Sequence, residues 1–203
     1  MTCSGARTSD FSTSQAPGVP PQLDAVGKDT RLVTMTTSGN DGGVFVSSFF
    51  GCAFTGSPTG SPCKDANGTT FTDTIQNVTY PALVEALSAV RATAPRASVV
   101  ILGYPQILPP TGSPACYAIT GISEGDVPWL VHQQEVGNDA VRRAAAAARH
   151  VDTYTPSAGH DECSGPTNRW MEPLAAPVNA FPVHPNATGE AALASETLAA
   201  LGR

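Results

Sequence analysis

The chain has 203 residues, of which 41% are hydrophobic and 14% are charged, so it is long enough and apolar enough to bury the core of one globular domain. Its formal net charge of -6 argues against nucleic acid or an anionic membrane as a partner. No apolar run approaches the length of a membrane span, and Met1 leads into polar sequence without a signal peptide. We therefore expect a single domain over residues 1–203.

The first part of the chain is predicted to contain long loops and one strand. Residues 9–22 are rich in Ser, Thr, Pro and Gly and are interpreted as a loop with a short turn. Residues 31–37 have the apolar pattern of a strand, and residues 38–43 form the turn that ends it. Residues 51–67 are interpreted as a surface excursion. Loops at the carboxyl ends of strands are where open α/β sheets place their sites.

The remaining chain is predicted to alternate helices and strands. Apolar residues recur at helical spacing over residues 80–94, where Pro95 stops the helix. The residues with this spacing are Leu83, Val84, Leu87 and Val90. Residues 97–103 indicate a strand buried on both faces, residues 126–150 contain a long helix with an Ala-rich end, and residues 149–155 a third strand. A last helix over residues 188–201 completes an α/β sandwich with a parallel sheet.

Five cysteines lie in loops rich in Gly, Pro and Ser, which favours disulfides over buried thiols. They are Cys3, Cys52, Cys63, Cys116 and Cys163. Disulfides indicate a secreted or cell-envelope protein, and its targeting segment is then expected upstream of Met1. No C-x-x-C or H-x-x-x-H spacing occurs, and the consecutive residues 160–163 (His-Asp-Glu-Cys) point in different directions. We therefore expect neither a metal nor another cofactor.

Two segments far apart in the sequence carry the residues best suited to catalysis. Residues 37–43 (Thr-Ser-Gly-Asn-Asp-Gly-Gly) contain Asn40, whose side-chain N–H can donate to a developing oxyanion. Residues 183–189 (Val-His-Pro-Asn-Ala-Thr-Gly) contain His184, which can act as a general base. An oxyanion donor and a base are two of the parts that acyl transfer needs.

Together with three further blocks, these segments resemble the secreted actinobacterial branch of the SGNH (GDSL-type) hydrolases. The further blocks are residues 2–7 (Thr-Cys-Ser-Gly-Ala-Arg), 102–105 (Leu-Gly-Tyr-Pro) and 159–163 (Gly-His-Asp-Glu-Cys). All the blocks occur in the family's order and extend over essentially the whole chain. The resemblance implies a flavodoxin-like three-layer α/β/α sandwich with a parallel sheet. It also implies an esterase or lipase that acts by acyl transfer to a serine, without a cofactor.

The resemblance gives roles to three residues of this sequence. Gly5 supplies a backbone N–H and Asn40 a side-chain N–H to the oxyanion hole, and His184 is the base. Many relatives have Asp three positions before the histidine, where this chain has Phe181, so a backbone carbonyl is expected to orient the imidazole instead. Without the resemblance, Gly5 would be interpreted as a turn glycine and Asn40 as an Asx-turn residue.

The resemblance also shows what this sequence lacks. Family members open with a strand that ends in Gly-Asp-Ser, whose serine is the nucleophile, and no Gly-Asp-Ser occurs in residues 1–203. We expect that the first strand, the first helix and most of the second strand are missing. The explanations left open are a natural truncation, a mis-started reading frame, a fragment that works with another piece, and a non-catalytic relative. The chain alone is expected to have little or no esterase activity.

Disulfides and a free sheet edge follow from the same resemblance. The implied pairs are Cys52 with Cys63 and Cys116 with Cys163. The family's partner for Cys3 lies in the missing block, so Cys3 is expected to be unpaired. The missing first strand is central in the family, so the strand at residues 31–37 is expected to expose an apolar edge. Marginal stability, and self-association through this edge or Cys3, are further expectations.

Two other functions remain open. A non-catalytic protein could keep the groove and bind an acyl ester or a glycan. Alternatively, residues 121–125 (Gly-Ile-Ser-Glu-Gly) match G-x-S-x-G, which would make Ser123 the nucleophile of an α/β-hydrolase-like enzyme. That motif needs a strand directly before it, whereas residues 115–120 are interpreted as a loop, so Ser123 is the weaker candidate. The expected substrate is a small ester, a lipid or an acetylated sugar, which the sequence does not rank.

Overall fold

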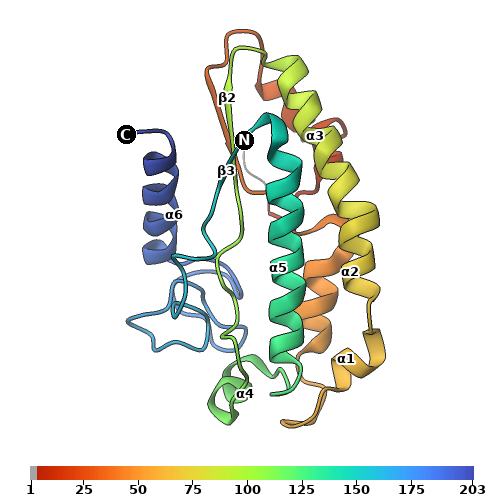
Figure 1. Ribbon diagram of the computed structural model, residues 1–203, viewed down its shortest axis with the longest axis vertical. Coiled ribbons are helices and arrows are strands. Elements are labelled where there is room, and N and C mark those ends of the chain that lie inside the picture. Colours follow the sequence, from red (N-terminus) through yellow and green to blue (C-terminus); the bar gives the residue numbers. More distant parts are fainter. Residues whose placement is uncertain (1–3) are drawn as a thin grey trace.

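The computed structural model describes residues 4–203, except for the side chain at position 147. Its centre is a parallel sheet of three strands, β1 (Leu32–Met35), β2 (Ser98–Leu102) and β3 (Arg149–Val151), in the order β1-β2-β3 (Figure 1). The expected α/β fold with a parallel sheet is therefore confirmed. Cys3, which the sequence predicts to be unpaired, lies outside the described residues.

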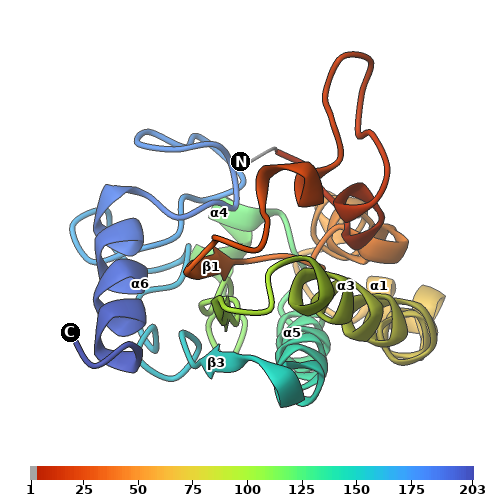
Figure 2. The same ribbon diagram turned by 90° about the horizontal axis from the view of Figure 1, so that it is seen from above.

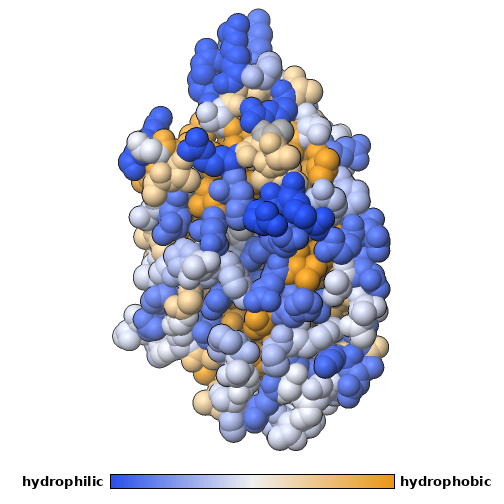
Figure 3. Space-filling view, in the orientation of Figure 1, coloured by the Kyte–Doolittle hydropathy of each residue, from blue (hydrophilic) through white to orange (hydrophobic). Residues whose placement is uncertain are grey.

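Helices cover both faces of this sheet. They are α1 (Pro62–Asn67), α2 (Thr70–Thr74), α3 (Tyr80–Thr93), α4 (Pro114–Thr120), α5 (Val127–Ala144) and α6 (Ala187–Ala200). Viewed from above, α3 and α5 lie on one side of the strands and α6 lies alone on the other (Figure 2). None of the described helices is both long and apolar enough to cross a membrane. On the face drawn in Figure 3, apolar side chains form small patches separated by hydrophilic ones.

The central strand β2 is buried on both faces, as its continuous apolar run predicts. Successive side chains of a strand point to opposite faces, so Val99 and Ile101 pack in the cluster formed with α3 and α5. Val100 and Leu102 point the other way and pack in a smaller cluster beside α6. The strand thus connects two unequal cores.

The strand β1 differs from β2 because it lies at an edge of the sheet. Among the described residues it pairs only with β2, in the register Leu32 opposite Ser98 to Met35 opposite Ile101. None of its four residues is fully buried, and Leu32 is 42% exposed. The free edge that the sequence predicts is therefore present in the structure.

The two long helices match their predicted positions with small differences. In α3, Leu83, Leu87 and Val90 are buried, but Val84, which we grouped with them, is exposed because it lies on the solvent side of the helix. The helix ends at Thr93 because Pro95 disfavours a helical conformation at the residue before it.

The predicted strand at residues 149–155 is shorter in the structure. It ends at Val151 because the carboxylate of Asp152 accepts hydrogen bonds from the backbone N–H groups of Tyr154 and Thr155, at 2.9 and 3.1 Å. This Asx-type turn competes with the sheet for the backbone.

Two segments interpreted as irregular from the sequence contain helices. The expected surface excursion at residues 51–67 includes α1, whose backbone N–H groups at Cys63 and Lys64 donate to the carboxylate of Asp126 at 3.1 and 2.9 Å. The expected loop at residues 115–120 is α4. Its first turn is capped by the Ser113 hydroxyl, which accepts from Cys116 N–H at 3.1 Å. The loop predicted at residues 115–120 was therefore wrong, and the helix within the surface excursion was not predicted, because capping and tertiary contacts stabilise helices too short to show periodicity.

Candidate active site

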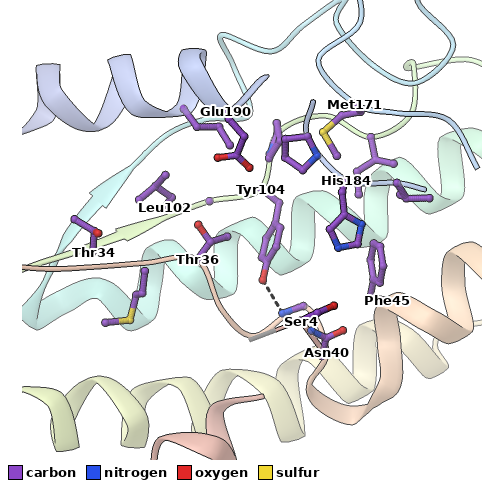
Figure 4. A pocket seen from close by; sticks show the side chains of 18 of the residues that line it. Ser4, Thr34, Thr36, Asn40, Phe45, Leu102, Tyr104, Met171, His184 and Glu190 are labelled. Atoms are coloured by element: carbon purple, nitrogen blue, oxygen red, sulfur yellow. Dashed lines mark hydrogen bonds between the residues drawn. The ribbon is translucent and has the colours of Figure 1, made fainter. Parts of the chain in front are cut away.

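A pocket of about 1050 Å³ opens between β1, the carboxyl end of β2 and the inner side of α6. Gly5, Asn40 and His184 all line it, although they come from three distant parts of the chain. Figure 4 shows Asn40 and His184 in this pocket. Most of the remaining wall is apolar, with Leu32, Met35, Leu102, Leu193 and Leu198 among its residues. The structure thus brings the three sequence-predicted site residues to one cavity.

Asn40 lies in the loop that follows β1, at the carboxyl edge of the sheet. The loop begins with Ser38 at a φ of 92°, an uncommon conformation for a residue other than glycine. The Asn40 side-chain amide donates one N–H to the carbonyl of Ala6 at 3.1 Å. An amide nitrogen carries two hydrogens, so this bond fixes the side chain and leaves the second N–H to donate elsewhere.

Gly5 lies on a short segment that docks against the Asn40 loop. It has a φ of 74°, which glycine adopts without the steric cost that a Cβ would bring. Asp41, a buried neighbour of Asn40, accepts a hydrogen bond from Thr8 N–H at 2.9 Å. Burial raises the pKa of Asp41, while the bond from Thr8 acts in the opposite direction. Asp41 therefore joins the two segments that carry the candidate oxyanion donors.

His184 is exposed to the pocket just before α6 begins, and its ring is oriented by the backbone. Its Nδ1 lies 2.8 Å from the carbonyl oxygen of Pro182. Because a carbonyl only accepts, Nδ1 carries the proton in this contact and Nε2 keeps its lone pair. The rings of Phe181 and Phe45 meet the imidazole edge-on at centroid distances of 5.3 and 6.4 Å. A backbone carbonyl thus contacts the imidazole where many relatives are expected to have an aspartate.

Tyr104 supports the Asn40 loop from the side of β2, a role that the sequence did not reveal. Its hydroxyl accepts a hydrogen bond from Gly39 N–H at 2.8 Å, the dashed line in Figure 4. A Cβ at position 39 would approach that hydroxyl to 2.9 Å, so only glycine fits there without displacement. The Asn138 amide brackets Tyr104 by accepting from its N–H at 2.7 Å and donating to its carbonyl at 2.9 Å. Burial raises the pKa of Tyr104 to about 12, so the hydroxyl stays protonated.

The pocket contains the candidate base and the candidate oxyanion donors, and no Gly-Asp-Ser motif occurs in residues 1–203. Ser4, which adjoins Gly5, is the serine among the described pocket-lining residues.

The structure gives no support to Ser123 as a nucleophile. Ser123 is fully buried, does not belong to the pocket lining, and donates its hydroxyl to the carbonyl of Ser57 at 2.5 Å. It follows α4 and not a strand, so the turn that the G-x-S-x-G motif requires is not formed. The hydroxyl instead helps to hold the loop before α1 against the start of α5.

The cysteines and the residues beside them have structural contacts. The described disulfides are Cys52–Cys63 and Cys116–Cys163, the pairs implied by the resemblance. His160 stacks on Trp170 at a centroid distance of 4.3 Å, whereas Glu162 points into the interior. Among residues 4–203, no cluster of three or more His, Cys, Asp or Glu side chains has the arrangement of a metal site.

Comparison with known proteins finds relatives among the lipases of Streptomyces. The chain is 49% identical to Lipase 2 of Streptomyces coelicolor over 207 aligned positions, which cover 100% of this chain and 70% of that protein. It is 32% identical to a lipase of Streptomyces rimosus over 193 positions, which cover 93% of this chain and 64% of that protein. The chain thus spans roughly two thirds of the length of these relatives.

Solved structures give the same picture. Phospholipase A1 from Streptomyces albidoflavus NA297 superposes with a TM-score of 0.75 at 27% identity, and the extracellular lipase of Streptomyces rimosus with 0.75 at 28%. Each match covers 98% of this chain and 77% of the other. A model of the GDSL-like lipase/acylhydrolase family matches residues 1–192. The ester-hydrolase family expected from the sequence is therefore confirmed: the chain belongs to the GDSL-like lipase/acylhydrolase family.

Proposed function

We propose that the chain forms the general-base and oxyanion part of a carboxylic-ester hydrolase site. The observation that carries this proposal is the collection of Gly5, Asn40 and His184 in one pocket. Gly5 offers a backbone N–H, Asn40 offers its second side-chain N–H, and His184 offers the Nε2 lone pair. Acyl transfer needs a base that removes a proton and donors that stabilise a negative oxygen, and these groups can supply both.

The proposed reaction is acyl transfer to a serine and then to water. His184 Nε2 takes the hydroxyl proton as the serine oxygen bonds to the ester carbonyl carbon, and the carbonyl oxygen becomes negative between the donors of Gly5 and Asn40. Collapse of this intermediate breaks the bond to the alcohol, which leaves with the proton from His184. Water then attacks the acyl-serine by the same steps, releasing the carboxylic acid and restoring the serine.

We place the nucleophile on a strand that lies along the free edge of β1. That edge has no described partner, and β1 residues Leu32 and Thr34 line the pocket opposite α6. Parallel strands bring their carboxyl ends to the same edge of a sheet, so a serine ending such a strand would lie near Asn40. The Gly-Asp-Ser strand that the family pattern includes fits this position. A second copy of the chain could pair there instead, and self-association would then compete with activity.

The substrate class we propose is an ester with an acyl chain. Phe45, Val46, Phe50 and Phe181 line the same pocket, and the last three are exposed. Such a rim favours apolar chains over acetylated sugars, which would leave hydroxyl groups facing apolar walls. The relatives named as lipases and phospholipase A1 support this choice. The two disulfides and the extracellular relative support secretion.

Fluorophosphonate labelling with peptide mapping tests the proposal. The chain is measured alone and co-expressed with a Gly-Asp-Ser strand segment, each with and without His184→Ala. We expect labelling of the supplied serine and turnover of a p-nitrophenyl ester only with both the segment and His184. The oligomeric state, followed by ultracentrifugation, is expected to shift toward a one-to-one complex. Ser4→Ala and Ser123→Ala are the matched controls. Labelling of Ser123, or turnover that does not depend on His184, would contradict the proposal.

The second candidate is a non-catalytic protein that binds acyl esters. The large apolar pocket favours it. Saturable binding of a fluorescent fatty-acyl ester that is unchanged by His184→Ala, combined with no labelling in the presence of the segment, would select this alternative. Loss of binding with the pocket blocked by Leu193→Trp would show that the ligand occupies the same cavity.

A further inference from the structure

The loop that carries His184 has a backbone conformation that its own residues disfavour. Val183 has a φ of 59°, in the left-handed region that β-branched side chains rarely adopt, and Ala176 in the same loop has a φ of 51°. Such conformations persist where surrounding contacts over-determine them. The Val183 side chain is buried, so it also anchors the loop. Some group nearby must hold Val183 and His184 in place.

Glu172 contacts both of these residues through its main chain. Its N–H donates to the carbonyl of His184 at 2.9 Å, and its carbonyl accepts from Val183 N–H at 2.9 Å. Met171 and Pro185 form an antiparallel bridge beside this pair. Glu172 is therefore the backbone partner of the strained residue and of the base that follows it.

The carboxylate of Glu172 binds both ends of the same loop. It accepts from Val178 N–H at 2.8 Å before His184 and from Asn186 Nδ2 at 3.1 Å after it. Arg169 donates to both carboxylate oxygens, at 2.9 and 3.3 Å. The Glu172 side chain is fully buried, and Arg169 and Asn186 are each less than one tenth exposed. One buried side chain thus fixes the loop on either side of the base.

Asn186 extends this clamp to α6. Its side-chain oxygen accepts from Thr188 N–H and Gly189 N–H, both at 3.0 Å, and so caps the helix. Its own N–H donates to the carbonyl of Trp170 at 2.8 Å. Because α6 forms one wall of the pocket, the clamp sets the position of His184 relative to that wall.

The protonation state of Glu172 suits this task. Burial acts to raise the pKa of the carboxyl, but hydrogen bonds from Val178 N–H, Asn186 and Arg169 outweigh it and lower the pKa to about 2. The group is therefore ionised throughout the range in which a neutral histidine acts as a base, and all its bonds from N–H donors persist.

We infer that Glu172 is a positioning residue for His184, because its buried carboxylate holds the loop in which Pro182 fixes the Nδ1–H tautomer. This inference rests on the proposed function of His184 as the base. Glu172 thus acts together with the Pro182 carbonyl to orient the imidazole. Glu172 itself does not line the pocket.

The tautomer of His184 can be measured by long-range nitrogen-proton NMR on the labelled chain, without any turnover. In the native chain we expect the Nδ1–H form alone at a pH where the ring is neutral. In Glu172→Ala we expect that single form to be lost, with averaged signals from both tautomers. Glu172→Gln, which keeps an oxygen for the N–H donors but not the ion pair with Arg169, is expected to restore the Nδ1–H form in part. If Glu172→Ala does not fold, the tautomer measured in Glu172→Gln tests the inference.

Glu162→Gln is the matched control, because Glu162 is also fully buried and accepts a hydrogen bond from the same loop, at Leu174 N–H, but among the described residues it has no hydrogen bond to Val183 or His184. Its His184 signals should equal those of the native chain. A folded Glu172→Ala with a lower Tm and an unchanged tautomer would overturn the inference. In the complemented enzyme, we expect Glu172→Ala to lower kcat about 100-fold with little change in KM. If the complemented chain turns over no ester at all, the proposed function is contradicted. The NMR measurement of the tautomer still tests the role of Glu172 in that case.

Discussion

The two faces of the sheet are covered in different ways. On one face, α3 and α5 bury Leu83, Leu87, Val90 and Val141 against the strands, in a continuous apolar cluster. On the other, α6 is Ala- and Leu-rich, yet among its described residues only Gly189 is fully buried. The pocket occupies the space between α6 and β1. The face with the larger apolar cluster is thus separate from the face that borders the candidate site.

The apolar cluster beside α6 is small, and the loops of the candidate site are held by specific polar contacts together with a separate apolar cluster that includes Met171 and Val183. The carboxylate of Glu172 clamps the His184 loop, Tyr104 supports the Asn40 loop, and the Cys116–Cys163 disulfide joins α4 to the segment before that clamp. Hydrogen bonds and disulfides fix geometry without filling space, so they leave a cavity open to a ligand or a strand. Within one fold, the larger apolar cluster therefore lies on one face of the sheet, and the pocket that a ligand can enter lies on the other.

The largest effect is expected from truncating the well-packed face. Leu83→Ala removes a fully buried side chain between α3 and the sheet and should lower the free energy of unfolding by about 2–5 kcal/mol. Leu198→Ala on α6, where the side chain is 48% exposed, should change it by less than about 0.5 kcal/mol. Urea denaturation of both variants measures the difference. If both variants lose the same free energy of unfolding, the two faces of the sheet do not differ in how much their packing stabilises the protein.

A smaller effect is expected from Glu162, which lies beneath the loops of the site. Burial raises its pKa from 4.5 to about 8, against the bond from Leu174 N–H, and one carboxyl oxygen has no partner. A raised acid pKa means that the native state holds the proton more tightly than the unfolded chain does. The stability that Glu162 contributes is therefore fully present below about pH 4.5 and is lost as the pH rises through about 8.

Glu162→Gln is expected to remove this pH dependence and to stabilise the protein by on the order of 2 kcal/mol at alkaline pH. Unfolding free energies at about pH 5 and about pH 9 give the comparison. Glu190→Gln, an exposed change on α6, is the control and should follow the native profile. If the free energy of unfolding of Glu162→Gln still falls as the pH rises, another group causes the loss of stability at alkaline pH.

The smallest effect is expected from the Tyr104 hydroxyl. Tyr104→Phe removes the acceptor for Gly39 N–H and should cost about 1 kcal/mol. The local result is more diagnostic, since hydrogen exchange at the Gly39 amide should become faster while exchange in α3 is unchanged. Tyr154→Phe, which loses only a 3.4 Å contact with exposed Glu135, is the control. Unchanged exchange at Gly39 would mean that other contacts hold the Asn40 loop.

Local patterns in the sequence were sufficient for the long elements. The apolar run of β2 and the periodic residues of α3 appear in the structure close to their predicted bounds, because burial on one or both faces leaves a regular signal. The helices α1 and α4 were missed, since six or seven residues held by caps, a disulfide and Asp126 do not show a period. The G-x-S-x-G match at Ser123 misled for the converse reason, because a short motif carries no information on burial.

The sequence by itself indicated the α/β class, and short blocks in a fixed order carried the family resemblance that implied the disulfide pairs and the candidates Gly5, Asn40 and His184. Tertiary structure alone decided which distant groups meet: that Pro182 orients His184, that Glu172 clamps the loop around it, and that Tyr104 holds Gly39. These contacts join residues through backbone groups and single side chains. They depend on which distant segments the fold brings together. The sequence does not indicate these contacts, because a backbone carbonyl or N–H has no residue-specific pattern.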